Sequence, residues 1–96
     1  MPPEWPLAEV IPSQVYLDSL NTYESLFPNI REIHEGIVWT LERDPLCGTE
    51  VPKMLNHRVL KTYPASSQTE FYVLFKYSAA FHRVHLLSIS STGIIM

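Results

Sequence analysis

The stretch that decides the fold is Arg58–Ile89, "RVLKTYPASSQTEFYVLFKYSAAFHRVHLLSI". It contains three apolar runs separated by short polar joints. The joints "PASSQ" (64–68) and "SAA" (78–80) have the length of hairpin connections. The three runs are therefore predicted to form antiparallel strands of one sheet.

The middle run, residues 70–77, has the alternation of a strand. Its two predicted faces are Phe71, Val73, Phe75 and Tyr77 on one side, and Tyr72, Leu74 and Lys76 on the other. Both faces are largely apolar. This pattern is typical of a central strand, and it predicts that both faces of the sheet are covered.

The residues before this stretch predict a short strand and a helix. Leu7–Ile11 is apolar and bounded by prolines, which indicates a strand. Pro12 and Ser13 are residues typical of a helix start. Behind them, an apolar stripe at helical spacing predicts a helix that ends before Pro28. The stripe consists of Tyr16, Leu20, Tyr23 and Phe27.

A second helix is predicted to begin at Asn29, with Glu32 completing a capping box. Asp44-Pro45 ends it. Its expected buried face is Ile30, Ile33, Ile37 and Leu41, widened by Val38 and Trp39. Gly36 in mid-helix is explained either by close approach of the first helix or by a simple weak point in the helix. The fold class is therefore α+β, with an N-terminal strand, a two-helix hairpin and a three-stranded antiparallel meander packed on the helices.

The totals fit one domain covering residues 1–96. No apolar run is long enough to cross a bilayer, and the first residues lack the basic segment of a secretory signal. The single cysteine, Cys47, fits a reducing compartment, so we expect a cytoplasmic protein without membrane contact. No cofactor is expected. No metal is expected either, because the histidines and Cys47 lack zinc-like spacing.

The charge is unevenly distributed along the chain. The formal net charge is -3, yet nine of the ten acidic residues precede Pro52 and five of the seven Lys and Arg follow it. An acidic total argues against a general nucleic-acid binder, which needs an excess of positive charge. The basic second half nevertheless falls on the predicted sheet.

The order of elements and four segments resemble the RelE/ParE superfamily of bacterial toxin–antitoxin systems. The segments are "IVWTLERDPLCG" (37–48), "HRVLKTYP" (57–64), "FYVLFKY" (71–77) and "RVHLLSI" (83–89). The resemblance covers nearly the whole chain. It implies the toxin of a type II system, neutralised by a cognate antitoxin that wraps around it. In this family, RelE-like members cut messenger RNA on the ribosome and ParE-like members act on DNA gyrase.

The resemblance also implies which residues would act. RelE-like cleavage needs basic groups on the sheet that activate the ribose 2′-hydroxyl and stabilise the phosphorane. Arg58 and Lys61 match the first hairpin strand, and Arg83 and His85 lie two apart on the last one, where they should share a face. These four are the candidate catalytic residues. Because Arg58 and Lys61 are three apart, they should face opposite sides of the sheet.

This sequence departs from the family pattern at two places. Tyr72 stands where the family has an Arg, and "SSTGIIM" (90–96) replaces a basic tail that ends in Tyr or His. Three interpretations therefore stay open: a ribosome-dependent endoribonuclease, a ParE-like toxin that binds a protein target without being an enzyme, and an inactive relative that serves as a binding module. For every candidate, an exposed strand face or a partner-covered face is the simpler explanation. His82 is expected to lie in a turn, exposed to solvent.

Overall fold

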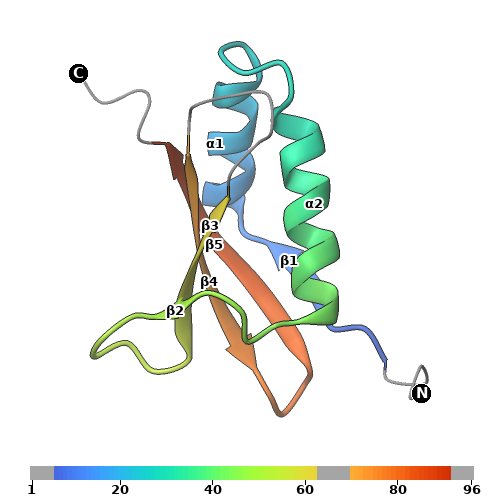
Figure 1. The fold of residues 1–96 in the computed structure, drawn as a ribbon, viewed down its shortest axis with the longest axis vertical. Coiled ribbons are helices and arrows are strands. Elements are labelled where there is room, and N and C mark those ends of the chain that lie inside the picture. The colour runs from blue at the N-terminus through green and yellow to red at the C-terminus, as the bar shows by residue number, and fades with distance from the viewer. Residues whose placement is uncertain (1–5, 63–69, 92–96) are drawn as a thin grey trace.

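A strand, two helices and four further strands follow one another in the computed structural model, which describes residues 6–62 and 70–91 (Figure 1). The elements are β1 (Glu9–Pro12), α1 (Gln14–Glu24), α2 (Ile30–Arg43), β2 (Thr49–Glu50), β3 (His57–Thr62), β4 (Phe71–Ser78) and β5 (Arg83–Ser91). The predicted α+β class and the order of its elements are confirmed. The short strand β2 was not predicted.

The sheet has the strand order β1-β5-β4-β3-β2. β1 runs parallel to β5, and the other neighbours are antiparallel. The last strand, β5, is thus paired with the first strand, β1, and the two edge strands of the sheet are β1 and β2. The register of β4 with β5 shifts at Leu74/Phe75, where Leu87 is the extra residue of a bulge.

Ser13 fixes the start of α1 and its position on the sheet. The Ser13 hydroxyl oxygen accepts a hydrogen bond from the Tyr16 amide at 3.1 Å, as an N-cap does. The same hydroxyl donates to the Leu87 carbonyl at 3.0 Å, so the cap is also attached to the bulge of β5. The helix ends at Glu24, before Pro28 as predicted.

The start of α2 differs from the prediction in its chemistry. Asn29 is the N-cap residue, but its side chain makes no cap hydrogen bond within the described part of the chain. Its φ of −90° and ψ of 7° lie outside the extended region that an N-cap adopts, so the predicted capping box with Glu32 is wrong. Trp39 was also expected to be buried, yet it is 58% exposed. The Arg43 guanidinium covers its outer side, 4.1 Å from the ring centroid.

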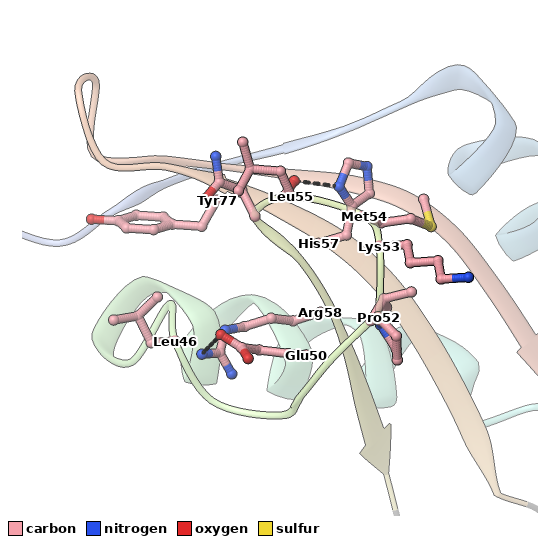
Figure 2. A pocket seen from close by; sticks show the side chains of 11 residues that line it. Leu46, Glu50, Pro52, Lys53, Met54, Leu55, His57, Arg58 and Tyr77 are labelled. Atoms are coloured by element: carbon pink, nitrogen blue, oxygen red, sulfur yellow. Dashed lines mark hydrogen bonds and ion pairs between the residues drawn. The ribbon is translucent and has the colours of Figure 1, made fainter.

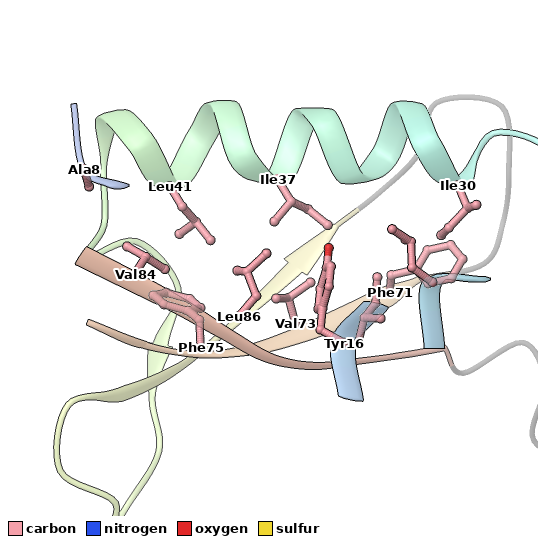
Figure 3. Packing of buried hydrophobic residues seen from close by; sticks show 12 residues of the cluster. Ala8, Tyr16, Ile30, Ile37, Leu41, Phe71, Val73, Phe75, Val84 and Leu86 are labelled. Carbon is pink, nitrogen blue, oxygen red and sulfur yellow. The ribbon is translucent and has the colours of Figure 1, made fainter. Parts of the chain in front are cut away.

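The core lies between the two helices and one face of the sheet (Figure 3). Ile37 and Leu41 of α2 point toward Phe75, Val84 and Leu86 on the strands, and all are buried. The prediction that both faces of β4 are covered is wrong. Two short helices form only one layer, so Tyr72 and Leu74 are half-buried by their strand neighbours and Lys76 is exposed.

Candidate functional site

The sheet face that points away from α1 and α2 bears no helix in residues 6–62 and 70–91, and we call it the open sheet face (Figure 1). Antiparallel partners directly opposite each other point to the same side, so the register identifies its members. Its charged, histidine and tyrosine side chains are Glu9, His57, Lys61, Tyr72, Lys76, Arg83 and His85. Most of the positive charge in the second half of the chain therefore gathers on one surface.

Three of the four predicted catalytic residues lie on the open sheet face. Lys61 is paired with Tyr72, Arg83 with Ser78, and His85 with Lys76. The predicted common face of Arg83 and His85 is confirmed, since the buried Val84 between them points into the core.

Arg58 lies on the other side of the sheet. It is paired with the buried Phe75, and its guanidinium donates to the Gly48 carbonyl at 3.2 Å. It also lies 3.5 Å from the Glu50 carboxylate. The expectation that Arg58 and Lys61 face opposite sides is thus confirmed. A catalytic role for the four residues stays a prediction.

Two of the basic residues on the open sheet face are partly neutralised. Arg83 donates to the Glu9 carboxylate at 3.0 Å, and Lys61 lies 3.6 Å from the Glu70 carboxylate. Glu70 also accepts a hydrogen bond from the Tyr72 hydroxyl at 2.9 Å. Both carboxylates stand at strand ends, so the middle of the open sheet face keeps its positive character.

The sequence interpretation missed two residues of this face, His57 and Lys76. His57 is the Cα partner of Lys76, and Lys76 is the partner of His85. The signal for Lys76 was present, because the alternation places it on the side of Tyr72. What was missing is the register of β3 and β5 against β4, which the alternation within one strand does not contain.

A shallow cavity of about 620 Å³ lies at one end of the sheet (Figure 2). The connection between β2 and β3 forms most of its wall, and the rest is formed by Leu46, Glu50, His57, Arg58 and Tyr77. His57 is fixed at its margin, where Nδ1 lies 2.7 Å from the Leu55 carbonyl oxygen. Because a carbonyl only accepts, this contact places the proton on Nδ1 and leaves Nε2 as the free acceptor.

A second hollow of about 290 Å³ lies between α2 and β3, and we call it the α2–β3 groove. Its lining is Ile33, Gly36, Ile37, Thr40, Leu60, Lys61 and Thr62. Of the two explanations for Gly36, close contact with the first helix is wrong. A Cβ at Gly36 would meet nothing within 4 Å, so the glycine widens the groove instead. The groove borders the part of β3 beyond Val59, where β2 no longer pairs with it in the described chain.

His82 does not point freely into solvent as expected. Its Nε2 lies 2.9 Å from the Pro6 carbonyl oxygen, and its Nδ1 lies 2.9 Å from the Tyr77 hydroxyl. The imidazole therefore donates to Pro6 and accepts from Tyr77, which connects the segment before β1 to the β4–β5 hairpin. This use of both ring nitrogens makes His82 a structural residue.

Cys47 and the histidines offer little for other chemistry. Burial, reinforced by the nearby Asp44 carboxylate, raises the pKa of the Cys47 thiol, which disfavours the reactive thiolate. Within residues 6–62 and 70–91, no three His, Cys, Asp or Glu side chains gather closely enough to hold a metal ion. The same part of the chain contains no helix long and apolar enough to span a membrane.

The predicted tail segment 90–96 lies largely outside the described residues, as does the "PASSQ" connection. The difference between this C-terminal segment and the family's basic tail therefore stays a difference in sequence alone. Tyr72, the other departure, lies on the open sheet face beside Lys61, whose Nζ is 5.8 Å from the Tyr72 ring centroid.

Comparison with known proteins identifies the fold. No protein-family model matches the sequence, and no curated protein matches it either. The structure, however, is similar to a chain of the intact E. coli RelBE toxin–antitoxin complex, with a TM-score of 0.64 and 10% sequence identity. The similarity covers 86% of this chain and 94% of that chain. The predicted RelE/ParE-like architecture is thus confirmed, and the chain has a RelE-like fold.

Proposed function

We propose that this protein is the toxin of a two-component toxin–antitoxin system. The observation that carries the proposal is the similarity to a chain of the E. coli RelBE complex over most of both chains. The open sheet face supports it, because a toxin needs a working surface that the fold itself leaves uncovered. That surface is basic although the whole chain is acidic, which favours a polyanion or an acidic protein as its target.

The α2–β3 groove is the place where we expect the cognate antitoxin to bind. Its floor is apolar, with Ile33, Ile37 and Leu60, and Lys61 stands at its margin. The neighbouring edge of β3 offers backbone groups that an added strand can pair with. An antitoxin segment with apolar side chains and a carboxylate opposite Lys61 fits this combination.

The activity that we favour is cleavage of messenger RNA on the ribosome. Lys61, Lys76 and the two histidines of the open sheet face supply cations and proton-exchanging groups on one surface, and a phosphodiester needs both. Tyr72 adds a phenol that stacks on a base or donates to a phosphate. RNA lying across this face would contact all three central strands.

Poisoning of a protein target such as DNA gyrase is the second candidate. The observation in its favour is that Arg83 and Arg58 are both held by carboxylates, at 3.0 Å from Glu9 and 3.5 Å from Glu50. Arginines engaged in this way suit a protein interface better than a phosphate site. This candidate needs no proton-transfer group on the sheet.

Induced expression in bacterial cells tests these proposals. We expect growth arrest, relief of the arrest by the product of the neighbouring reading frame, and cut messenger RNA in the arrested cells. Lys61→Ala should weaken the arrest, while Lys53→Gln, a charge-matched change in the β2–β3 connection, should not. Arrest with intact messenger RNA would favour the protein target. A chain that neither arrests growth nor binds the neighbouring product would contradict the toxin proposal.

A further inference from the structure

Three side chains from three adjacent strands form one row across the open sheet face. His57 on β3 is directly opposite Lys76 on β4, and Lys76 is directly opposite His85 on β5. Adjacent strands are about 4.8 Å apart, so the two histidines flank the lysine with about 10 Å between their backbones. The strand pairing fixes this order, because each residue has its partner within the continuous part of the ladder.

We propose that His57, Lys76 and His85 are the catalytic residues of an RNA-cleaving site, with His57 as general base and His85 as general acid. The inference rests on the proposed function and names the groups that perform it. It differs from the sequence prediction by adding His57 and Lys76, and by excluding Arg58, which lies on the opposite side of the sheet.

The hydrogen bond of His57 suits it to the role of base. Its Nδ1 proton is engaged by the Leu55 carbonyl at 2.7 Å, so the lone pair is on Nε2. A base with a fixed tautomer accepts a proton at one defined atom, which is how an oriented imidazole acts in other enzymes. No carboxylate is paired with His57 or His85 across the strands, so neither imidazole is committed to an ion pair there.

The spacing suits attack in line with the leaving group. The ribose 2′-oxygen attacks phosphorus while His57 Nε2 takes its proton, and the P–O5′ bond breaks as His85 donates a proton to the 5′-oxygen. Lys76, between them, faces the non-bridging oxygens and stabilises the charge of the phosphorane. The products are a 2′,3′-cyclic phosphate and a free 5′-hydroxyl, and the step consumes neither water nor an oxidant.

The environment of the row is consistent with this division of roles. Lys76 faces both histidines from β4, and Ile11 faces His85 from β1. The nearest charged pair on the same face is Arg83 with Glu9, whose contact is 3.0 Å. Arg83 therefore serves to hold β1 against β5, and the exposed Lys76 is the cation available to a phosphate.

The test incubates a messenger RNA with the wild-type protein, on ribosomes and alone, and measures the cleavage rate and the end groups of the products. His57→Asn keeps a donor for Leu55 but has no base, and His85→Gln keeps a polar side chain but has no acid. Each of these two substitutions should slow cleavage by about 100-fold or more. Lys76→Gln should slow cleavage by about 100-fold, because it removes the cation that stabilises the phosphorane. Lys53→Gln is the charge-matched control and should cleave at the wild-type rate.

A second substrate separates acid from base. It carries sulfur in place of the 5′-oxygen at the scissile bond, and a thiolate leaves without needing a proton. This RNA should restore the rate of His85→Gln and leave His57→Asn slow. Restoration of His57→Asn instead would overturn the assignment. Cleavage by the row variants within a few-fold of wild type, or no cleavage by the wild type at all, would overturn the site.

The toxin proposal is tested separately by growth arrest and its relief. If His57→Asn, Lys76→Gln and His85→Gln still arrest growth and still cleave RNA at the wild-type rate, the row is not the active site. The toxin proposal would then remain. Cleavage in vitro that depends on the row, with neither growth arrest in cells nor binding of the neighbouring product, supports the row and contradicts the toxin proposal. Circular dichroism of each variant must match the wild type, and these positions are on the surface, so the fold should persist.

Discussion

The Tyr16 hydroxyl lies 2.9 Å from Nδ1 of His34, and this part-buried contact joins α1 to α2. The rings are 5.5 Å apart between centroids. Tyr16 is completely buried, and burial raises the pKa of its phenol, so the hydroxyl keeps its proton and is the donor. His34 then accepts at Nδ1 in its neutral form.

Removal of this hydroxyl should destabilise the protein. Tyr16→Phe keeps the ring and the packing, and loses one hydrogen bond, which is worth about 1 kcal/mol. The free energy of unfolding from urea titration should fall by about that amount, with an unchanged dependence on urea concentration. An unchanged free energy of unfolding would mean that water replaces the Tyr16 hydroxyl at His34 without cost.

The same contact predicts a loss of stability in mild acid. Burial, with a contribution from the Arg31 charge, lowers the pKa of His34 below its ordinary value of 6.5. The unfolded state then binds a proton more readily than the folded state, so the free energy of unfolding decreases as the pH falls below about 6.5. His34→Gln should reduce the difference in stability between pH 7.5 and pH 5.5. An identical difference in the two proteins would contradict this account.

Substitution by alanine should change the stability of the protein in opposite directions at Gly48 and at Gly36. Gly48 has a φ of 87°, and a Cβ there would stand 2.5 Å from the Val59 carbonyl oxygen. Gly48→Ala should therefore destabilise by about 1–3 kcal/mol, because the backbone has to move. Gly36 is in mid-helix with open space around it, so Gly36→Ala should stabilise by about 1 kcal/mol. Thermal unfolding of both variants is the measurement, and each serves as the control for the other.

Filling the α2–β3 groove should act on binding and not on folding. Gly36 lines the groove together with Ile37 and Leu60, and a Cβ there meets nothing within 4 Å, so Gly36→Leu adds its side chain on the groove side. We expect the variant to remain folded and to lose affinity for the antitoxin by about tenfold or more, since one blocked contact in a packed interface costs about 1–3 kcal/mol. Titration calorimetry with the neighbouring gene product gives the answer. Unchanged affinity would place the antitoxin elsewhere.

The strands and helices were predictable because their signals are local. Ser13 before an apolar stripe predicted α1, and the alternation from Phe71 to Tyr77 predicted β4 and its faces. Two of the failures at α2 have local causes too. Asn29 adopts a backbone conformation in which its side chain does not cap the helix, and Trp39 finds Arg43 as a cover outside the core.

The candidate site was less predictable because it depends on register. His57, Lys76 and His85 are separated by up to 28 positions, and only the pairing of three strands aligns them. The His82 connections to Pro6 and Tyr77 are equally long-range, and a histidine in a turn gives no signal for them. Arg58 resembled a catalytic residue by its place in the strand. Its side chain, however, lies on the side opposite to the open sheet face, where it contacts the Gly48 carbonyl and the Glu50 carboxylate.

The opposite faces of Arg58 and Lys61 provide the sharpest test of which surface meets RNA. If RNA lies on the open sheet face, Lys61→Ala removes a phosphate contact, and the slope of log affinity against log salt concentration should decrease by about 1. Arg58→Ala removes the same charge from the other side and should leave that slope unchanged. Fluorescence anisotropy with a labelled RNA oligonucleotide, measured between low and physiological salt, separates the two. A larger change for Arg58→Ala would move the RNA to the cavity beside Glu50 and Tyr77, and the open sheet face would then be free for a protein partner.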